Sequence, residues 1–99
     1  MSMTPEKKVK KKVMKILKEH RAYSFYASTG GYGNSGVPDI ICCLNGHFLA
    51  IECKAGKNTT TTLQDINIEA IRQAGGTACV INEDNVETLP SLLNKFTSI

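Results

Sequence analysis

Two acidic residues and a lysine, Asp39, Glu52 and Lys54, are brought to one place by the pattern of a predicted β-hairpin. Two apolar runs rich in β-branched residues flank Asn45-Gly46, and Asn-Gly is a strong signal for a two-residue turn because both of its residues need a positive φ. The register set by this turn places Asp39 directly opposite Glu52, and Lys54 emerges on the same face because strand side chains alternate. Like charges opposite one another destabilise a sheet, so a divalent cation between the two carboxylates is the expected compensation.

The hairpin itself, residues 37–54, is apolar on both of its faces. In the predicted register Cys43 pairs with Phe48 and Ile41 pairs with Ala50. Strands of this kind are buried on both sides, so helices should cover both faces of the sheet. The residues on one face are Ile41, Cys43, Phe48 and Ala50, and those on the other are Ile40, Cys42, Leu44, Leu49 and Ile51. Acids in such a setting are desolvated, which raises a carboxyl pKa unless a cation keeps the group ionised.

A helix is predicted from about residue 5 to residue 19. Thr4 is a suitable N-cap, Pro5 fits the first helical position, and Glu6 places an acid in the first turn, where the helix dipole favours it. Apolar residues at helical spacing form one face of this helix: Val9, Val13, Ile16 and Leu17. Glu6 lies on that face, so it either reaches toward the sheet and its acids or only satisfies the helix dipole.

Seven of the twelve basic residues fall on this helix, mostly on the side away from its apolar face. They are Lys7, Lys8, Lys10, Lys11, Lys12, Lys15 and Lys18. Such a ridge is either a solvated helix surface or a surface that contacts phosphates, and phosphate contact predicts binding that weakens steeply with salt. The formal net charge of the chain is only +3, so the distribution of charge says more about partners than its sum does.

Residues 21–28 form a predicted strand, and residues 29–36 form a polar, glycine-rich loop. The loop contains a literal Gly-x-Gly-x-x-Gly at Gly31, Gly33 and Gly36. A dinucleotide-binding fingerprint needs a helix after the glycines, whereas Val37-Pro38 opens a strand. The glycines therefore either let the backbone approach a bulky substrate near Asp39 or belong to an ordinary loop.

A second helix is predicted from residue 61 to about residue 74, after the polar segment that follows Lys54. Thr61 and Gln64 form a Ser/Thr-x-x-Glu/Gln capping box, and Gly75-Gly76 ends the helix. The residues predicted to face the core are Leu63, Ile66, Ala70 and Ala74. Gln64 is either a cap residue alone or also a neighbour of the two acids.

A short apolar strand at residues 77–81 and a last helix complete the predicted order of elements, α-β-β-β-α-β-α. The strand follows a strand and a crossover helix, so it should lie parallel to one of its neighbours. Pro90 lies inside the last helical segment, where it marks a kink or a second start.

Size and composition indicate one domain, residues 1–99, built around one core. The chain is 41% apolar and 21% charged, which is ordinary for a globular protein. It has no apolar run long enough to span a bilayer and no signal-peptide pattern, so we expect an intracellular protein with no membrane partner. Four cysteines lie in apolar runs without the spacing of a zinc site and are expected to be reduced core thiols: Cys42, Cys43, Cys53 and Cys79.

The order of these motifs resembles the stand-alone, phage-type VRR-NUC family of the PD-(D/E)XK nuclease superfamily. The resemblance is carried by Gly36-Val37-Pro38-Asp39, the Asn45-Gly46 turn, Glu52-Cys53-Lys54, Gln64, and Gly75-Gly76 before an apolar strand. It covers about residues 4 to 82. It implies an α/β fold with a restriction-endonuclease-like α-β-β-β-α-β core, in which helices flank a mixed sheet.

The resemblance also implies an active site that hydrolyses phosphodiester bonds with Mg²⁺ or Mn²⁺. Asp39 and Glu52 would be metal ligands with the Cys53 backbone carbonyl as a third, and Lys54 would orient the attacking water. Glu6 matches the first-helix acid of the family, which holds metal through water. The set of implied catalytic residues is Glu6, Asp39, Glu52, Lys54 and Gln64.

The substrate implied by the resemblance is DNA, particularly branched DNA such as Holliday junctions, cut by a homodimer with two active sites. The lysines predicted to contact it are Lys7, Lys8, Lys11, Lys12, Lys15 and Lys57. Two other interpretations of the same residues are open. The chain could be a non-catalytic nucleic-acid-binding module that uses the basic first helix, or Asp39 and Lys54 could form only structural ion pairs at a sheet edge.

Overall fold

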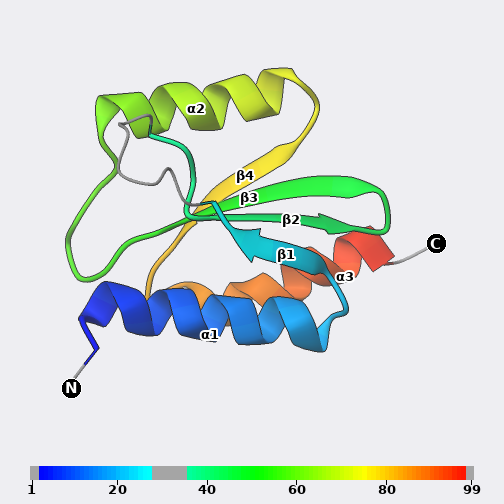
Figure 1. Cartoon of the computed structure of the whole chain (residues 1–99), viewed down its shortest axis with the longest axis horizontal. Helices are drawn as coiled ribbons and strands as arrows, with labels where there is room; N and C mark the ends of the chain where they lie inside the picture. Colours follow the sequence, from blue (N-terminus) through cyan, green and yellow to red (C-terminus); the bar gives the residue numbers. More distant parts are fainter. Residues whose placement is uncertain (1–2, 28–35, 98–99) are drawn as a thin grey trace.

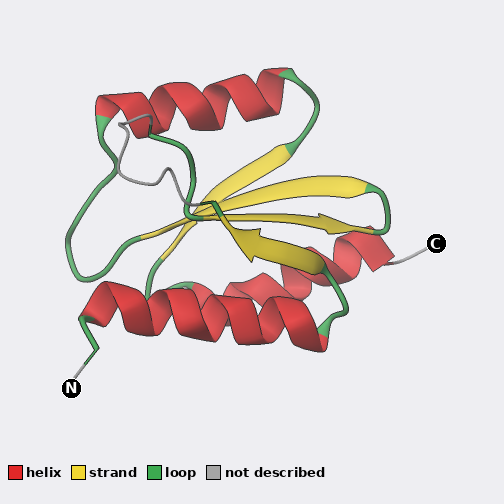
Figure 2. Cartoon of the chain, in the orientation of Figure 1, coloured by secondary structure: helices red, strands yellow, loops and turns green. Residues whose placement is uncertain are grey.

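The computed structural model describes residues 3–27 and 36–97. Figure 1 shows the arrangement of the elements, and Figure 2 shows it by secondary structure. In chain order they are α1 (Pro5–Glu19), β1 (Tyr23–Tyr26), β2 (Ile40–Leu44), β3 (His47–Cys53), α2 (Thr62–Gln73), β4 (Thr77–Ile81), a 3-10 turn η1 (Val86–Thr88) and α3 (Leu89–Thr97). Most of the predicted loop at residues 29–36 lies outside the described residues, and only Gly36 belongs to them.

The strands form one four-stranded mixed sheet in the order β1-β2-β3-β4. The first two pairs are antiparallel, and β4 lies parallel to β3. The helix α2 lies on one side of this sheet, and α1 and α3 lie on the other (Figure 1). The predicted α/β class, with helices flanking a mixed sheet, is confirmed. No helix in the described part of the chain is both long and apolar enough to cross a bilayer.

The hairpin turn has the predicted geometry, with φ of 53° at Asn45 and 85° at Gly46. The register is also confirmed, because Cys43 pairs with Phe48 and Ile41 with Ala50. The ladder nevertheless ends at the Ile40–Ile51 pair, so Asp39 precedes the strand instead of occupying a ladder position opposite Glu52. This frees the Asp39 side chain to bond to the backbone of β3.

The larger core lies between the sheet and the helices α1 and α3. Its fully buried members include Val13 and Leu17 of α1, Ile40 of β2, Leu49 of β3 and Leu93 of α3. The prediction that α1 starts after a Thr4 cap is also confirmed, since the Lys7 amide donates to Thr4 Oγ1 at 3.2 Å.

The core on the α2 side is smaller, centred on Ala50, Ile68 and Ala78. The prediction that the hairpin is buried along both faces is wrong on this side, because Cys43 is exposed and Phe48 is 44% exposed. A single helix of 12 residues that packs chiefly on β4 is too short to cover four strands. The prediction that all the cysteines are core thiols is therefore wrong for Cys43.

The predicted inner face of α2 is also wrong. Leu63, Ile66, Ala70 and Ala74 are all exposed, whereas Ile68 is buried and Ile71 is partly buried. Ile68 and Ile71 lie four and seven residues after Gln64, so the three share one helix face. This rotation packs Ile68 and Ile71 against Ala50 and Ala78 of the sheet and also brings Gln64 into hydrogen-bond contact with Glu52.

The last helical segment starts twice, as Pro90 suggests. A 3-10 turn ends at Thr88, and α3 begins at Leu89, so Pro90 occupies the first turn of α3. In that turn the backbone amides have no intrahelical acceptor, and proline therefore costs nothing there. The predicted first strand is shorter than expected, covering Tyr23–Tyr26 only.

Candidate functional site

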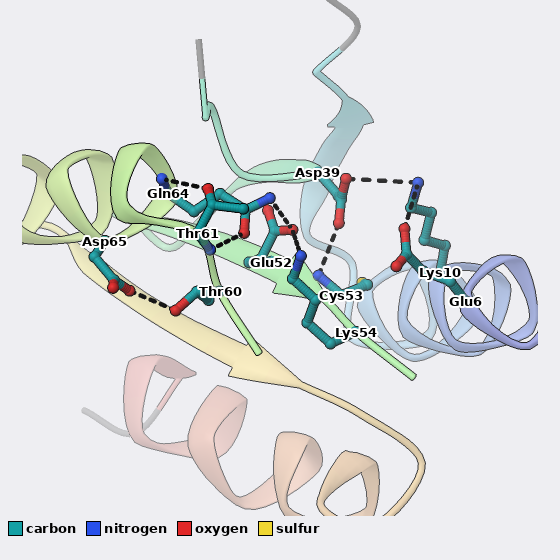
Figure 3. A network of polar contacts seen from close by, with 10 residues as sticks. All are labelled: Glu6, Lys10, Asp39, Glu52, Cys53, Lys54, Thr60, Thr61, Gln64 and Asp65. Carbon is teal, nitrogen blue, oxygen red and sulfur yellow. Dashed lines mark hydrogen bonds and ion pairs between the residues drawn. The ribbon is translucent and has the colours of Figure 1, made fainter. Parts of the chain in front are cut away.

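Glu52 is the centre of a polar cluster at the end of β3 (Figure 3). Its residue surface is only 2% exposed. Oε2 accepts a hydrogen bond from Gln64 Nε2 at 2.9 Å and lies 3.6 Å from Lys54 Nζ. Oε1 is buried and has no hydrogen-bond partner among the described residues. A buried carboxylate oxygen without a partner is costly, so this atom calls for a ligand.

The pKa of Glu52 reflects the same surroundings. Burial, and after it the negative charge of Asp39, raise the pKa of this carboxyl to about 7, although the charge of Lys54 works in the opposite direction. In the absence of a cation, these surroundings favour the protonated form of Glu52. A bound cation would favour its ionised form.

Asp39 stands beside Glu52 at the entry to β2. Its Oδ2 accepts a hydrogen bond from the Cys53 amide at 2.8 Å, and its backbone carbonyl accepts one from the Ala27 amide at 2.9 Å. The amide and the carbonyl of one strand residue point to the same side of the strand. The Cys53 carbonyl therefore points to the side on which Asp39 lies, as the predicted ligand set requires.

Lys10 is a member of the site that the sequence did not indicate. Its Nζ lies 3.5 Å from Asp39 Oδ1 and 3.6 Å from Glu6 Oε2, and it stands between these two acids in Figure 3. Burial lowers the pKa of Lys10, but the charges of Asp39 and Glu6 together outweigh burial, so the pKa is raised. The available signal was its position four residues after Glu6, which puts both side chains on one side of the helix.

In the part of the chain that the structure describes, Glu6 is joined to Asp39 through Lys10. Within residues 3–27 and 36–97 no three His, Cys, Asp or Glu side chains lie close enough to hold a metal ion directly. Asp39, Glu52 and the Cys53 carbonyl still offer three oxygen donors where β3 ends and β2 begins. Oxygen donors together with the partnerless Glu52 Oε1 fit a hard divalent cation such as Mg²⁺ or Mn²⁺.

Gln64 both caps the helix α2 and contacts Glu52, the two roles that the sequence left open. Its side-chain oxygen accepts from the Thr61 amide and its backbone amide donates to Thr61 Oγ1, which completes the capping box. Its side-chain nitrogen binds Glu52. The helix cap thus also holds the buried carboxylate.

Gly36 helps to position Asp39, because it lies three residues before it and packs against the start of α2. It has a φ of +69°, and a Cβ added there would lie 2.5 Å from the Leu63 carbonyl carbon and 2.8 Å from the Gln64 amide nitrogen. Such contacts are too short for any side chain, so only glycine lets the segment before Asp39 pack against the start of α2.

The predicted DNA-contacting lysines are distributed over several surfaces. Lys7, Lys8, Lys11 and Lys15 are exposed on α1, as predicted for a basic ridge. Lys12 instead forms an ion pair of 3.0 Å with Glu87, so part of its charge is neutralised. Lys57 is exposed after β3 and lines a shallow hollow together with Glu6.

A mixed sheet with an Asp and a Glu-x-Lys pair at the end of one hairpin is the arrangement that the resemblance to the nucleases implies. The model of the archaeal Holliday junction resolvase (Hjc) family matches residues 7–81. The chain belongs to this family. No curated protein matches the sequence.

Two solved structures share the fold. A protein described as a VRR_NUC domain protein superposes with a TM-score of 0.71 at 21% identity, covering 97% of this chain and 90% of that chain. Archaeoglobus fulgidus Hjc, a Holliday junction resolvase from an archaeal hyperthermophile, superposes with a TM-score of 0.53 at 20% identity, covering 72% of this chain and 63% of that chain. The family match and the first of these structures confirm the resemblance to the VRR-NUC nucleases.

Proposed function

We propose that this chain is a metal-dependent endonuclease that hydrolyses phosphodiester bonds in branched DNA, such as Holliday junctions. The observation that carries the proposal is Glu52 Oε1, a buried carboxylate oxygen without a hydrogen-bond partner among the described residues, with Asp39 beside it. Membership of the junction resolvase family supports junction DNA as the substrate.

Asp39, Glu52 and the Cys53 carbonyl hold the cation in this proposal, which is Mg²⁺ or Mn²⁺ by the chemistry of its oxygen donors. When bound, such a cation lowers the pKa of a coordinated water and neutralises charge on the phosphate. Glu6 contributes through a water, because Lys10 separates it from Asp39. Gln64 keeps Glu52 Oε2 occupied and so leaves Oε1 for the cation.

Lys54 is the residue assigned to the attacking water. Its side chain is 13% exposed and lies 3.6 Å from Glu52 Oε2, so its ammonium group is held next to the carboxylates yet reaches solvent. From there Lys54 can orient the water with a donated hydrogen bond and offset negative charge that develops on the phosphate oxygens.

The exposed lysines of α1 and Lys57 bind the DNA backbone in this proposal. Phosphate neutralisation releases counterions, so the affinity should fall steeply as salt increases. Lys12 should contribute less than its neighbours because Glu87 already pairs with it.

Cleavage assays test the proposal most directly. Holliday junction, flap, duplex and single-stranded DNA are incubated with the protein and Mg²⁺ or Mn²⁺, in parallel with Asp39→Asn, Glu52→Gln and Lys54→Met variants. The proposal requires cleavage of junction DNA that disappears in EDTA and drops by at least about a hundredfold in each variant. Cleavage that persists in Asp39→Asn contradicts it. Salt-sensitive binding without turnover would identify a non-catalytic binding module instead.

A homodimer completes the proposal, because symmetric cutting of two strands of a junction needs two sites. The outer face of α2 supports it, since Leu63 and Ile66 lie one turn apart and are 52% and 57% exposed. Sedimentation equilibrium checks this point. A species of only 10.8 kDa at all concentrations contradicts dimerisation, and a dimer should dissociate in a Leu63→Ser, Ile66→Ser variant.

A further inference from the structure

The strand β1 carries large aromatic side chains on an open edge of the sheet. Among residues 3–27 and 36–97 it has a neighbouring strand on one side only, since β1 is the first strand in the sheet order. Three of its four residues are exposed aromatics: Tyr23, Phe25 and Tyr26, at 75%, 49% and 48% exposure. Strand alternation puts Tyr23 and Phe25 on one face of this edge, where their rings contact each other, and Tyr26 on the other. Exposed edge strands are usually protected by charges or covered, so exposed aromatic rings at this edge indicate a binding surface.

This aromatic edge ends at the candidate active site. Tyr26 pairs with Ile40, and the next amide, that of Ala27, donates to the Asp39 carbonyl at 2.9 Å. Tyr26 points to the side of α1, because its neighbour Ser24 on the same face contacts Met14 of α1 at 3.3 Å. The backbone of Tyr26 is therefore one residue along the ladder from Asp39.

Positive charge accompanies the aromatic edge on the α1 side. Tyr26 lines a wide, open hollow of about 1070 Å³ over α1, and the charged residues in this lining are four lysines and two glutamates: Lys11, Lys12, Lys15, Lys18, Glu19 and Glu87. Positions 11, 15 and 18 follow one side of the helix about one turn apart. Aromatic rings beside a row of lysines form the combination that holds single-stranded nucleic acid, in which the rings stack on bases and the cations follow the backbone.

We propose that the β1 edge and these α1 lysines bind unpaired nucleotides of the DNA substrate next to the site of cleavage. The proposal rests on the proposed function only in that DNA is the substrate. In a duplex the faces of the bases are stacked on one another, so Tyr26 can stack only on a base that is unpaired. The feature recognised is thus a short unpaired stretch at a branch point, and not the duplex arms.

A second copy of the chain is the competing occupant of this edge. Pairing of two β1 strands would bring the basic α1 helices of both copies toward each other, which like-charge repulsion disfavours. DNA, in contrast, is complementary to the lysines. The DNA occupant is therefore favoured, and self-association enters the test below as the contrary outcome.

The test is DNA binding measured by fluorescence anisotropy in EDTA, so that cleavage is absent. The two probes are a labelled duplex of about 30 base pairs, long enough to cover the domain, and the same duplex with unpaired thymidine arms. The variants are Tyr26→Leu, which keeps bulk but removes the ring, and Tyr26→Phe, which keeps the ring. Phe48→Leu is the matched control, since Phe48 is 44% exposed at the opposite end of the hairpin.

We expect Tyr26→Leu to weaken binding of the armed probe about tenfold, while binding of the duplex changes less than about twofold. Tyr26→Phe and Phe48→Leu should bind both probes like the wild type. Lys15→Gln should weaken both probes and reduce the salt dependence by about one phosphate contact. Equal losses on both probes for Tyr26→Leu, or no loss, overturn the inference.

Sedimentation of the Tyr26→Leu variant without DNA tests whether a second copy of the chain, and not DNA, occupies the β1 edge. A dimer that dissociates in this variant assigns the edge to a second copy and also overturns the inference. Failure of the proposed nuclease function can be told apart from failure of this inference, because the assay measures DNA binding without cleavage. A protein that cleaves no DNA yet shows the Tyr26-dependent preference refutes only the nuclease activity, and an active nuclease without this preference refutes only the inference.

Discussion

Gln64 Nε2 donates a 2.9 Å hydrogen bond to Glu52 Oε2, and this contact joins the first turn of α2 to the buried carboxylate of β3. The oxygen of the same side chain accepts from the Thr61 amide at 2.9 Å. Both ends of the Gln64 amide are therefore used, one in the helix cap and one in the site. The cap holds the Gln64 side chain at the start of α2, and the bond from this side chain to Oε2 leaves Oε1 of Glu52 without a partner among the described residues.

Replacing Gln64 should cost more stability than the loss of a helix cap. Gln64→Leu removes half of the capping box and leaves a second Glu52 oxygen without its donor, so we expect a loss of about 2–3 kcal/mol in the free energy of unfolding. Thr61→Ala is the control because it weakens the cap alone, at about 1 kcal/mol. Urea unfolding in EDTA measures both, and equal losses would show that the Gln64–Glu52 bond contributes nothing.

Lys10 should compete with a divalent cation for Asp39. Its ammonium group lies 3.5 Å from Asp39 Oδ1, and that attraction must be given up when a cation binds there. We expect Lys10→Met to tighten Mn²⁺ binding about tenfold, equivalent to about 1.4 kcal/mol. Isothermal titration calorimetry without DNA gives the dissociation constant.

The control for Lys10 is Lys11→Met, which removes an exposed lysine at the next position. Its charge is solvated, so Mn²⁺ affinity should change less than about twofold. Weaker Mn²⁺ binding in Lys10→Met would contradict the competition and would indicate that Lys10 supports the metal-bound arrangement.

Gly36 should not tolerate alanine. Its φ of +69° strains any side chain, and the added Cβ would also lie 2.5 Å from the backbone of Leu63. Gly56 is a matched control because it has a similar φ of +61° but nothing within 4 Å of an added Cβ. Gly56→Ala should cost about 1 kcal/mol from backbone strain alone.

We expect Gly36→Ala to cost at least about 2 kcal/mol more than Gly56→Ala and to weaken Mn²⁺ binding, since Asp39 follows in the displaced segment. Urea unfolding and calorimetry check the two effects separately. Equal free energies of unfolding of the two variants would mean that the segment before Asp39 can move away from α2 without a loss of stability.

The metal-free protein should lose stability as pH rises through the range in which Glu52 ionises. Its pKa is raised from 4.5 to about 7 by burial and by Asp39, so between these values the folded state binds more protons than the unfolded state. The free energy of unfolding therefore falls from about pH 4.5 to about pH 7 and levels off above it. The Glu52 contribution is at most about 3.5 kcal/mol, at about 1.4 kcal/mol per pKa unit.

Urea unfolding in EDTA at a series of pH values from about 5 to about 8 measures this slope in the wild type and in Glu52→Gln, which should lack the Glu52 contribution. Glu69→Gln on the exposed side of α2 is the control and should keep it. Added Mn²⁺ should stabilise the wild type more at the alkaline end of this series than at the acid end, because the ligand is then already ionised. A slope unchanged in Glu52→Gln would contradict the assignment.

Features set by neighbouring residues follow from the sequence by itself. Asn45 and Gly46 specify their turn because both tolerate a positive φ, and a two-residue turn determines every later pair of the hairpin. The Thr4 cap and the Thr61 and Gln64 capping box are likewise local, since their partners lie three residues away. Side chains alternate along a strand, which puts Glu52 and Lys54 on one face. This too can be predicted from the sequence, because it does not depend on distant segments.

Only the tertiary structure decided which surfaces meet. The helix α2 has apolar residues on two sides, and its packing on the sheet buries Ile68 and leaves Leu63 and Ile66 outside. Lys10 counts as one more lysine of the ridge until the packing of α1 on the sheet brings it to Asp39. Local patterns act over a few residues, whereas burial and ion pairing depend on what lies opposite, and that is determined by packing between distant segments.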